Sequence, residues 1–152
     1  MPTPLTTSSL ETPIGRISLD CTEHAVCALR LPGEAVVAPP PAPGSPAERA
    51  FRQIAEYLRR ERRYFSLPLQ LPEYLSPFAR QILCKIAAIP CGCTATYGSL
   101  GAARAVGRIC AANPLPLLIP CHRIIPAVNP PGNYQGGTEL KIRLLQLESS
   151  HF

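Results

Sequence analysis

Proline is the residue that most constrains what this chain can fold into. The 152 residues include 19 prolines, which cluster at the N-terminus, at residues 32–46 and at 114–120. Each proline fixes φ and lacks a backbone donor, so the clusters are predicted to be loops or linkers between short elements. A hydrophobic content of 46% is normal for a globular protein, and the length suits one compact domain or two small ones.

The first half of the chain carries the pattern of a small sheet followed by a helix. Apolar and polar residues alternate at 14–19 and again at 26–31, which predicts a β-hairpin. The proline-rich segment 32–46 is predicted to be an exposed loop. Ser45 and Pro46 are typical N-cap and first-turn residues, and they predict a helix that runs to about Arg60.

The second half is predicted to be mostly helical. Ser76-Pro77 predicts a helix that ends near Pro90, and a short extended piece follows at 94–97. Apolar residues at helical spacing predict two further helices, at 101–112 and 139–148. We therefore expect an α+β fold with an N-terminal domain at 1–75 and a C-terminal domain at 76–152.

Charge is unevenly distributed between these halves. Residues 1–75 hold eight arginines and eight acidic residues, whereas residues 76–152 hold seven Lys or Arg and two Glu, so the second half carries the formal net charge of +5. A basic half favours an anionic partner, with nucleic acid the obvious choice. Ordinary solubility charge is the alternative at this point.

The seven cysteines are predicted to be reduced thiols. Their number is odd, and Met1 to Ser9 lacks the basic and apolar regions of a secretion signal. No stretch is long enough to span a membrane, so we expect a soluble intracellular protein. Cys91 and Cys93 are separated by one residue rather than the two of common zinc pairs, so neither a metal nor another cofactor is predicted.

Cys121 is the strongest candidate for chemistry, because His122 and Arg123 follow it directly. A thiolate attacks far better than a thiol, and a neighbouring base or positive charge lowers a cysteine pKa. Three prolines between 114 and 120 limit the flexibility of the approach to Cys121. The alternative is that Cys121 packs as a small apolar residue.

A series of motifs in fixed order surrounds this cysteine. They are Ala102-Ala103-Arg104-Ala105-Val106-Gly107, Asn113-Pro114, Pro120-Cys121-His122-Arg123, Gly132-Asn133-Tyr134-Gln135-Gly136-Gly137, Lys141, Leu144-Leu145 and Glu148. Together they resemble the methylated-DNA-protein-cysteine methyltransferases, which are 6-O-alkylguanine-DNA alkyltransferases. The likeness includes 76–97 and, more weakly, the hairpin at 12–15. It implies a ribonuclease-H-like N-terminal domain and a helix-turn-helix in the C-terminal domain.

The resemblance implies transfer of an alkyl group from oxygen six of guanine to Cys121, once per protein. It assigns to Glu148 the orientation of His122, and to His122 an action on Cys121 through a water. A relay is needed if the two residues are extended, because adjacent side chains in an extended segment point to opposite sides. Asn113 would brace the cysteine loop, with a plain helix C-cap as the alternative. Tyr97 would help to protonate the leaving guanine, or it is a core tyrosine.

The resemblance also implies a pocket and a surface for double-stranded DNA containing 6-O-alkylguanine. The pocket residues would be Pro116, Ile124, Tyr134, Gln135, Gly136 and Gly137, although Gln135 lies where the family varies and its side-chain role is open. The DNA-binding residues would be Ala102, Ala103, Arg104, Gly107, Arg108 and Arg123. Arg104 would fill the gap left by a flipped base, and the protein would act as a monomer.

One segment departs from the family pattern. Between Tyr97 and Ala102 the chain has four residues, whereas the family usually has about two further helical turns. Three functions remain open: a single-turnover DNA repair transferase, a lesion-binding protein with weak or no transferase activity, and a cysteine hydrolase that uses Cys121, His122 and Glu148. The first agrees best with the motifs.

Overall fold

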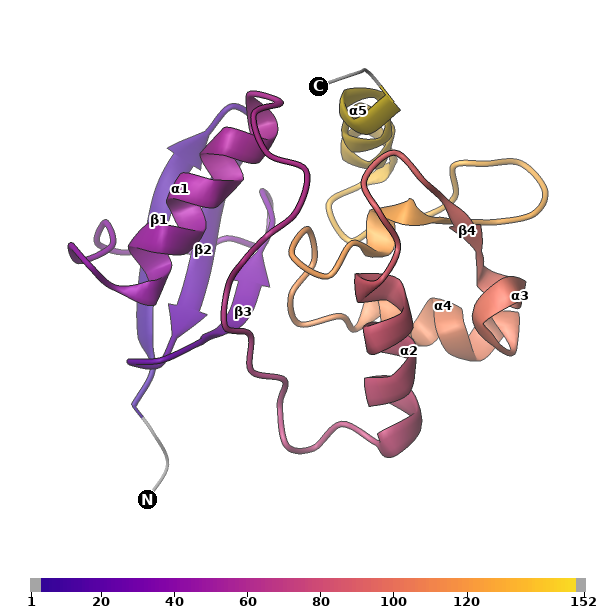
Figure 1. The fold of residues 1–152 in the computed structure, drawn as a ribbon, viewed down its shortest axis with the longest axis horizontal. Helices are drawn as coiled ribbons and strands as arrows, with labels where there is room; N and C mark the ends of the chain where they lie inside the picture. Colours follow the sequence, from indigo (N-terminus) through magenta and orange to yellow (C-terminus); the bar gives the residue numbers. More distant parts are fainter. Residues whose placement is uncertain (1–3, 150–152) are drawn as a thin grey trace. The chain divides into compact units, whose positions relative to one another are not determined.

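The computed structural model describes residues 4–149, which form two compact units (Figure 1). The first unit extends to Pro72 and the second begins at Glu73. Antiparallel strands and several helices are present, so the predicted α+β class is confirmed. Within the described residues, no helix has the length and apolar character needed to cross a membrane.

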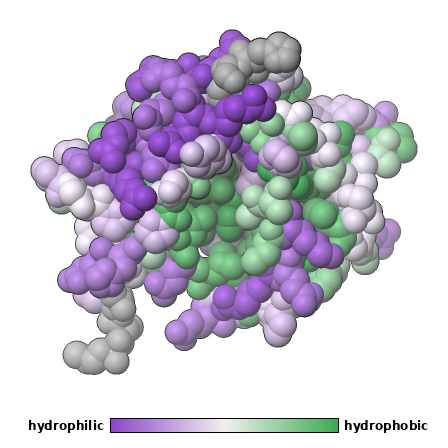
Figure 2. All heavy atoms as spheres, in the orientation of Figure 1, coloured by the Kyte–Doolittle hydropathy of each residue, from purple (hydrophilic) through white to green (hydrophobic). Residues whose placement is uncertain are grey.

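The first unit is a three-stranded antiparallel sheet with one helix packed against it. The strands β1 (Thr6–Thr12), β2 (Gly15–Cys21) and β3 (Val26–Arg30) are ordered β1-β2-β3. Helix α1 (Pro46–Leu58) contacts all three strands and buries Phe51 and Ile54, while its outer face is hydrophilic (Figure 2). The hydroxyl of Ser45 accepts from the Glu48 amide at 3.2 Å, so the predicted N-cap is confirmed.

The alternation of apolar and polar residues did not predict strand β1, because the sequence of that strand does not alternate. Ser8 and Ser9 are both 3% exposed, although buried strand positions are usually apolar. The Ser9 hydroxyl donates to the Ala38 carbonyl and accepts from the Ala38 amide, both at 2.9 Å. The proline-rich segment therefore satisfies the Ser9 hydroxyl, through a contact over 29 residues that local sequence patterns do not reveal.

The described part of the second unit contains four helices and two very short strands. Its elements are α2 (Pro77–Ala87), β4 (Ala95–Thr96), α3 (Tyr97–Leu100), α4 (Ala103–Ala111), a 3-10 turn η1 (Cys121–Arg123), β5 (Ile124–Ile125) and α5 (Thr138–Ser149). Strands β4 and β5 pair in parallel. Ile82, Ile86, Val106, Ile124 and Leu144 are among the buried residues of its core. The predicted helices after Ser76, at 101–112 and at 139–148 are confirmed with small shifts of their ends.

Candidate active site

Cys121 and His122 both lie on the turn η1 rather than in an extended segment. The Arg123 amide donates to the Pro120 carbonyl at 2.9 Å, and this bond closes the turn. Both side chains are buried: Cys121 is 3% exposed and His122 is fully enclosed. The opposed directions of an extended pair therefore do not apply here, and the turn presents both groups to the interior of the second unit.

The loop that leads to Cys121 is held by Asn113, which follows α4. The Asn113 Nδ2 donates to the Ile119 carbonyl at 3.0 Å, and its Oδ1 accepts from the Leu115 amide at 2.9 Å. Within the loop, Leu117 adopts a φ of 75°, which is strained for a leucine. Leu117 is 1% exposed, so packing and the Asn113 bonds hold this conformation.

Glu148 on α5 binds both residues that follow Cys121. Its Oε2 lies 2.6 Å from the His122 Nε2, and its Oε1 accepts from the Arg123 Nε at 2.8 Å. Arg123 also donates from Nη2 to the Glu148 Oε2 at 3.0 Å and from Nη1 to the Ile89 carbonyl at 2.6 Å. All three side chains are buried, so charges and hydrogen bonds are paired where water is excluded.

This network determines the protonation of His122. Burial would raise the pKa of Glu148, but the hydrogen bonds and charges of His122 and Arg123 outweigh it and lower the pKa to about 2. Burial lowers the pKa of His122 despite its bond to Glu148. A carboxylate only accepts, so the neutral imidazole carries its hydrogen on Nε2. Its Nδ1 keeps a lone pair and has no hydrogen-bond partner among residues 4–149.

These pKa shifts predict a loss of stability in acid. Glu148 has a lower pKa in the folded state than its ordinary 4.5, so its stabilising contribution is complete above pH 4.5 and lost as the pH falls towards 2. The lowered pKa of His122 acts in the same direction below its ordinary 6.5. Urea unfolding at pH 7 and pH 3 should give a smaller difference in unfolding free energy for Glu148→Gln than for the wild type. An equal difference in both proteins would contradict this assignment.

Two groups oppose the effect of burial on Cys121. Burial raises the pKa of its thiol, whereas a hydrogen bond from Asn113 and the charge of Lys141 lower it. Lys141 lies on α5 with its side chain fully buried, and its ammonium donates to the Ile124 carbonyl at 2.6 Å and to the Tyr97 hydroxyl at 3.5 Å. The sequence suggested His122 and Arg123 for this electrostatic role, but His122 is neutral and the charge of Arg123 is paired with Glu148.

Tyr97 and Tyr134 both face this group. Burial raises the pKa of Tyr97, and the charge of Lys141 lies 5.7 Å from the centre of its ring. The ring of Tyr134 is edge-on to that of His122, with 6.1 Å between their centres. The hydroxyl of Tyr134 is buried, and no described residue forms a hydrogen bond with it. The ring of Tyr134 thus lies next to His122, and Tyr97 lies close enough to Cys121 to feel its charge.

The remaining predicted pocket residues differ in burial. Pro116 and Ile124 are buried beside the cysteine loop and the turn η1, whereas Gln135 and Gly137 are exposed. Gly136 is half-buried. The backbone of Gly137 has a φ of 94°, which suits glycine where the loop turns into α5.

The predicted DNA-binding residues separate into two groups. Ala102, Ala103, Arg104 and Arg108 are exposed on or next to α4, and Gly107 is half-buried. Arg123 is not on this surface: it is 6% exposed and bound to Glu148 and Ile89. The motif placed Arg123 next to a reactive residue, but only the fold shows that its guanidinium points to α5.

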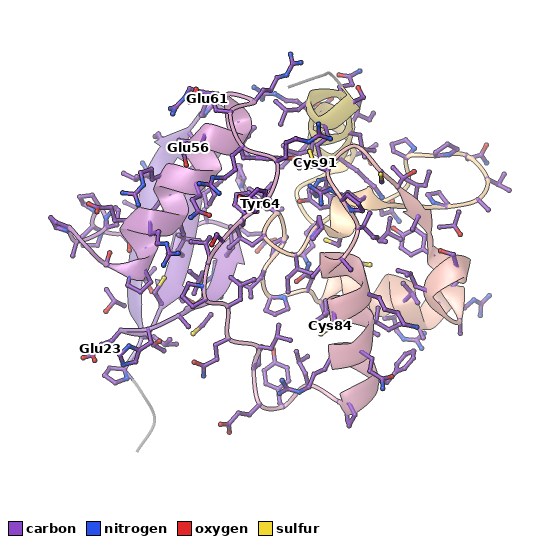
Figure 3. All side chains as sticks on the ribbon, in the orientation of Figure 1. Glu23, Glu56, Glu61, Tyr64, Cys84 and Cys91 are labelled. Atoms are coloured by element: carbon purple, nitrogen blue, oxygen red, sulfur yellow. The ribbon has the colours of Figure 1, made fainter. Side chains whose placement is uncertain are left out.

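Cys110 on α4 also lies close to this group, and burial and the charge of Cys121 raise the pKa of its thiol to about 12. Cys84 is exposed on α2, and Cys91 is buried in the segment that follows that helix (Figure 3). Between residues 4 and 149, the structure brings no three His, Cys, Asp or Glu side chains together as metal ligands.

Comparison with known proteins agrees with this arrangement. Residues 77–150 match the family described as 6-O-methylguanine DNA methyltransferase, DNA binding domain. The human methylated-DNA--protein-cysteine methyltransferase is 31% identical over an alignment of 166 residues, gaps included. The match covers 93% of this chain and 79% of the human protein. A probable enzyme of the same name from Acanthamoeba polyphaga mimivirus is 33% identical over 114 residues, with 70% of this chain and 74% of that protein covered.

Solved structures show the same likeness. The O6-methylguanine methyltransferase of Mycobacterium tuberculosis is 29% identical, with a TM-score of 0.83 and coverage of 96% of this chain and 93% of that one. A structure of the M. tuberculosis protein in complex with DNA is 30% identical with a TM-score of 0.83, and the match covers 94% and 92% of the two chains. The chain belongs to the family of methylated-DNA-protein-cysteine methyltransferases.

Proposed function

We infer that this chain repairs DNA by direct reversal: it transfers a methyl or other alkyl group from 6-O-alkylguanine in double-stranded DNA to Cys121. The single observation that best supports this is the buried chain of Glu148, His122 and Cys121. Glu148 holds the Nε2 of His122, and the free lone pair on Nδ1 is a base next to a buried thiol. A family of cysteine methyltransferases uses a thiol as acceptor, which agrees with this geometry.

In the reaction we propose, His122 takes the proton of Cys121 through a water molecule. The thiolate attacks the alkyl carbon, a sulfur–carbon bond forms, and the bond between that carbon and oxygen six of guanine breaks with its electron pair on the base. The leaving guanine receives a proton from the Tyr97 hydroxyl, which is restored by the protonated His122 through solvent. The thioether is a poor leaving group, so the protein acts once.

We also propose that the target nucleotide leaves the duplex to reach Cys121. A base atom inside the helix is out of reach of a buried thiol, and extrusion costs a few kcal/mol. Arg104 is exposed near the start of α4, where it would enter the minor groove and fill the gap. Arg108 is exposed on the same helix and would contact phosphate.

The helices α3 and α4 would act as a shortened helix-turn-helix. Helix α3 has four residues, and Gly101 and Ala102 join it to the nine residues of α4. The two helices are in contact with each other. We propose that a ribonuclease-H-like first unit accompanies this DNA-binding unit in a monomer.

Mass spectrometry of the intact protein tests the transfer. After incubation with duplex DNA that contains 6-O-methylguanine, we expect one added methyl group per protein, located on Cys121 by peptide mapping. Unmodified duplex DNA is the control and should add nothing. DNA binding without an adduct would instead select the lesion-binding function. Repeated turnover of an ester or amide would select the hydrolase.

A further inference from the structure

The side chain of Gln135 reaches from the loop before α5 to the C-terminal end of α4. Its Nε2 donates to the Cys110 carbonyl at 2.9 Å and to the Asn113 carbonyl at 3.0 Å. The Gln135 amide thus donates both of its hydrogens to backbone carbonyls at the end of α4. Carbonyls at this end of a helix lack partners within the helix. Such a contact fixes the position of the loop relative to α4.

The same contact extends to the loop that carries the reactive thiol. Asn113, whose carbonyl accepts from Gln135, uses its own side chain to bind Leu115 and Ile119 in the loop before Cys121. Gln135 therefore binds the residue, Asn113, that braces the loop before Cys121. A shift of this contact would be transmitted through Asn113 to the loop that carries the thiol.

Tyr134 is held from both sides. On one side, Lys141 donates to the Asn133 carbonyl at 3.1 Å, and on the other side Gln135 binds α4. Tyr134 lies between these two anchors with its ring against His122. Because both neighbours are fixed, the tyrosine ring has a defined position in the pocket.

The two ends of α4 differ in their side-chain hydrogen bonds. Its N-cap residue, Ala102, provides no side-chain hydrogen bond, and the helix before it has only four residues. A helix without a side-chain cap is less firmly held at its start. The amide of Gln135 thus supplies at the other end of α4 a side-chain hydrogen bond that the N-cap residue does not supply.

We propose that Gln135 is a positioning residue that fixes the pocket wall formed by Tyr134 to the end of α4. The helix that contacts DNA and the pocket that receives the base then stay in a fixed position relative to each other. This inference rests on the proposed function, because it assigns Arg104 on α4 to DNA and Tyr134 to the alkylguanine pocket. It gives a role to a position at which the family motif allows several residues.

The test compares Gln135→Glu with Gln135→Lys. The first variant keeps the size of the side chain but loses both donors, whereas the second retains donors that can reach the carbonyls. Because each protein reacts once, the final amount of methylated protein counts folded molecules, and the rate constant reports the geometry of those molecules. We expect the rate constant with methylated duplex DNA to fall roughly tenfold in Gln135→Glu, since small misplacements of reacting groups slow reactions steeply.

Gln135→Lys should recover most of this rate, and Gln146→Glu, the same change at an exposed position on α5, should not alter it. A loss of final amount in Gln135→Glu with an unchanged rate constant would show a merely structural role and overturn the proposal. Amide hydrogen exchange of residues 132–137, measured without DNA, should be faster in Gln135→Glu. Unchanged exchange would overturn the anchor even if transfer is normal, whereas wild-type protein without an adduct would overturn the proposed function separately.

Discussion

Replacing Cys121 with serine is expected to abolish alkyl transfer while leaving the protein folded and able to bind DNA. A serine hydroxyl is almost the size of the thiol, but its far higher pKa keeps it protonated even beside His122. Mass spectrometry should detect no methyl group after incubation with DNA containing 6-O-methylguanine. Thermal unfolding and binding to the same duplex should resemble those of the wild type.

Cys84→Ser is the matched control, because Cys84 is exposed on α2. This variant should accept one methyl group at the wild-type rate. Methylation of the Cys121→Ser protein at any other cysteine would contradict the assignment of Cys121 as the acceptor.

The second large effect is expected for Glu148→Gln, which removes the negative charge between His122 and Arg123. The amide nitrogen of the glutamine would face the N–H groups of His122 or Arg123, which are also donors. The buried guanidinium of Arg123 would lose its charged partner. Breaking such a buried pair costs about 3 kcal/mol of unfolding free energy. The transfer rate should fall by roughly 10²-fold or more, because His122 loses its orientation as a base.

The control for this variant is Glu139→Gln, on the exposed first turn of the same helix α5. Urea unfolding at pH 7 gives the change in stability, and single-turnover rates of the folded fraction give the change in reactivity. If Glu148→Gln reacted like the Glu139 variant, the proposed base would be wrong.

Local signals were enough to predict most helices. Ser45 and Ser76 each precede a proline at the first helical position, and each accepts a hydrogen bond from the backbone three residues later. These interactions lie within one turn, so the sequence contains them completely. Strand β1 depends instead on a hydrogen bond between Ser9 and Ala38. This bond can be recognised only once the position of the proline-rich segment in the fold is known.

The candidate site shows the same division. The motif brought Cys121 and His122 together because they are adjacent, and the resemblance added Glu148. The positions of Arg123 and Lys141 could not be derived in this way, because the contact of Arg123 with Glu148 spans 25 residues and that of Lys141 with Ile124 spans 17. A charge in a basic half of the chain suggests a DNA contact. Only packing shows that Arg123 binds Glu148 and that Lys141 binds the Ile124 carbonyl and the Tyr97 hydroxyl.

The burial of Cys121 also determines what the protein does between encounters with damaged DNA. Oxidants such as peroxide and small electrophiles react mainly with exposed thiolates. A thiol that is 3% exposed and whose pKa is raised by burial keeps its proton and meets few such molecules. In a protein whose sulfur reacts once, a thiol lost to an oxidant cannot repair a lesion. The burial that slows the reaction of Cys121 with oxidants therefore keeps the protein active until it meets a lesion.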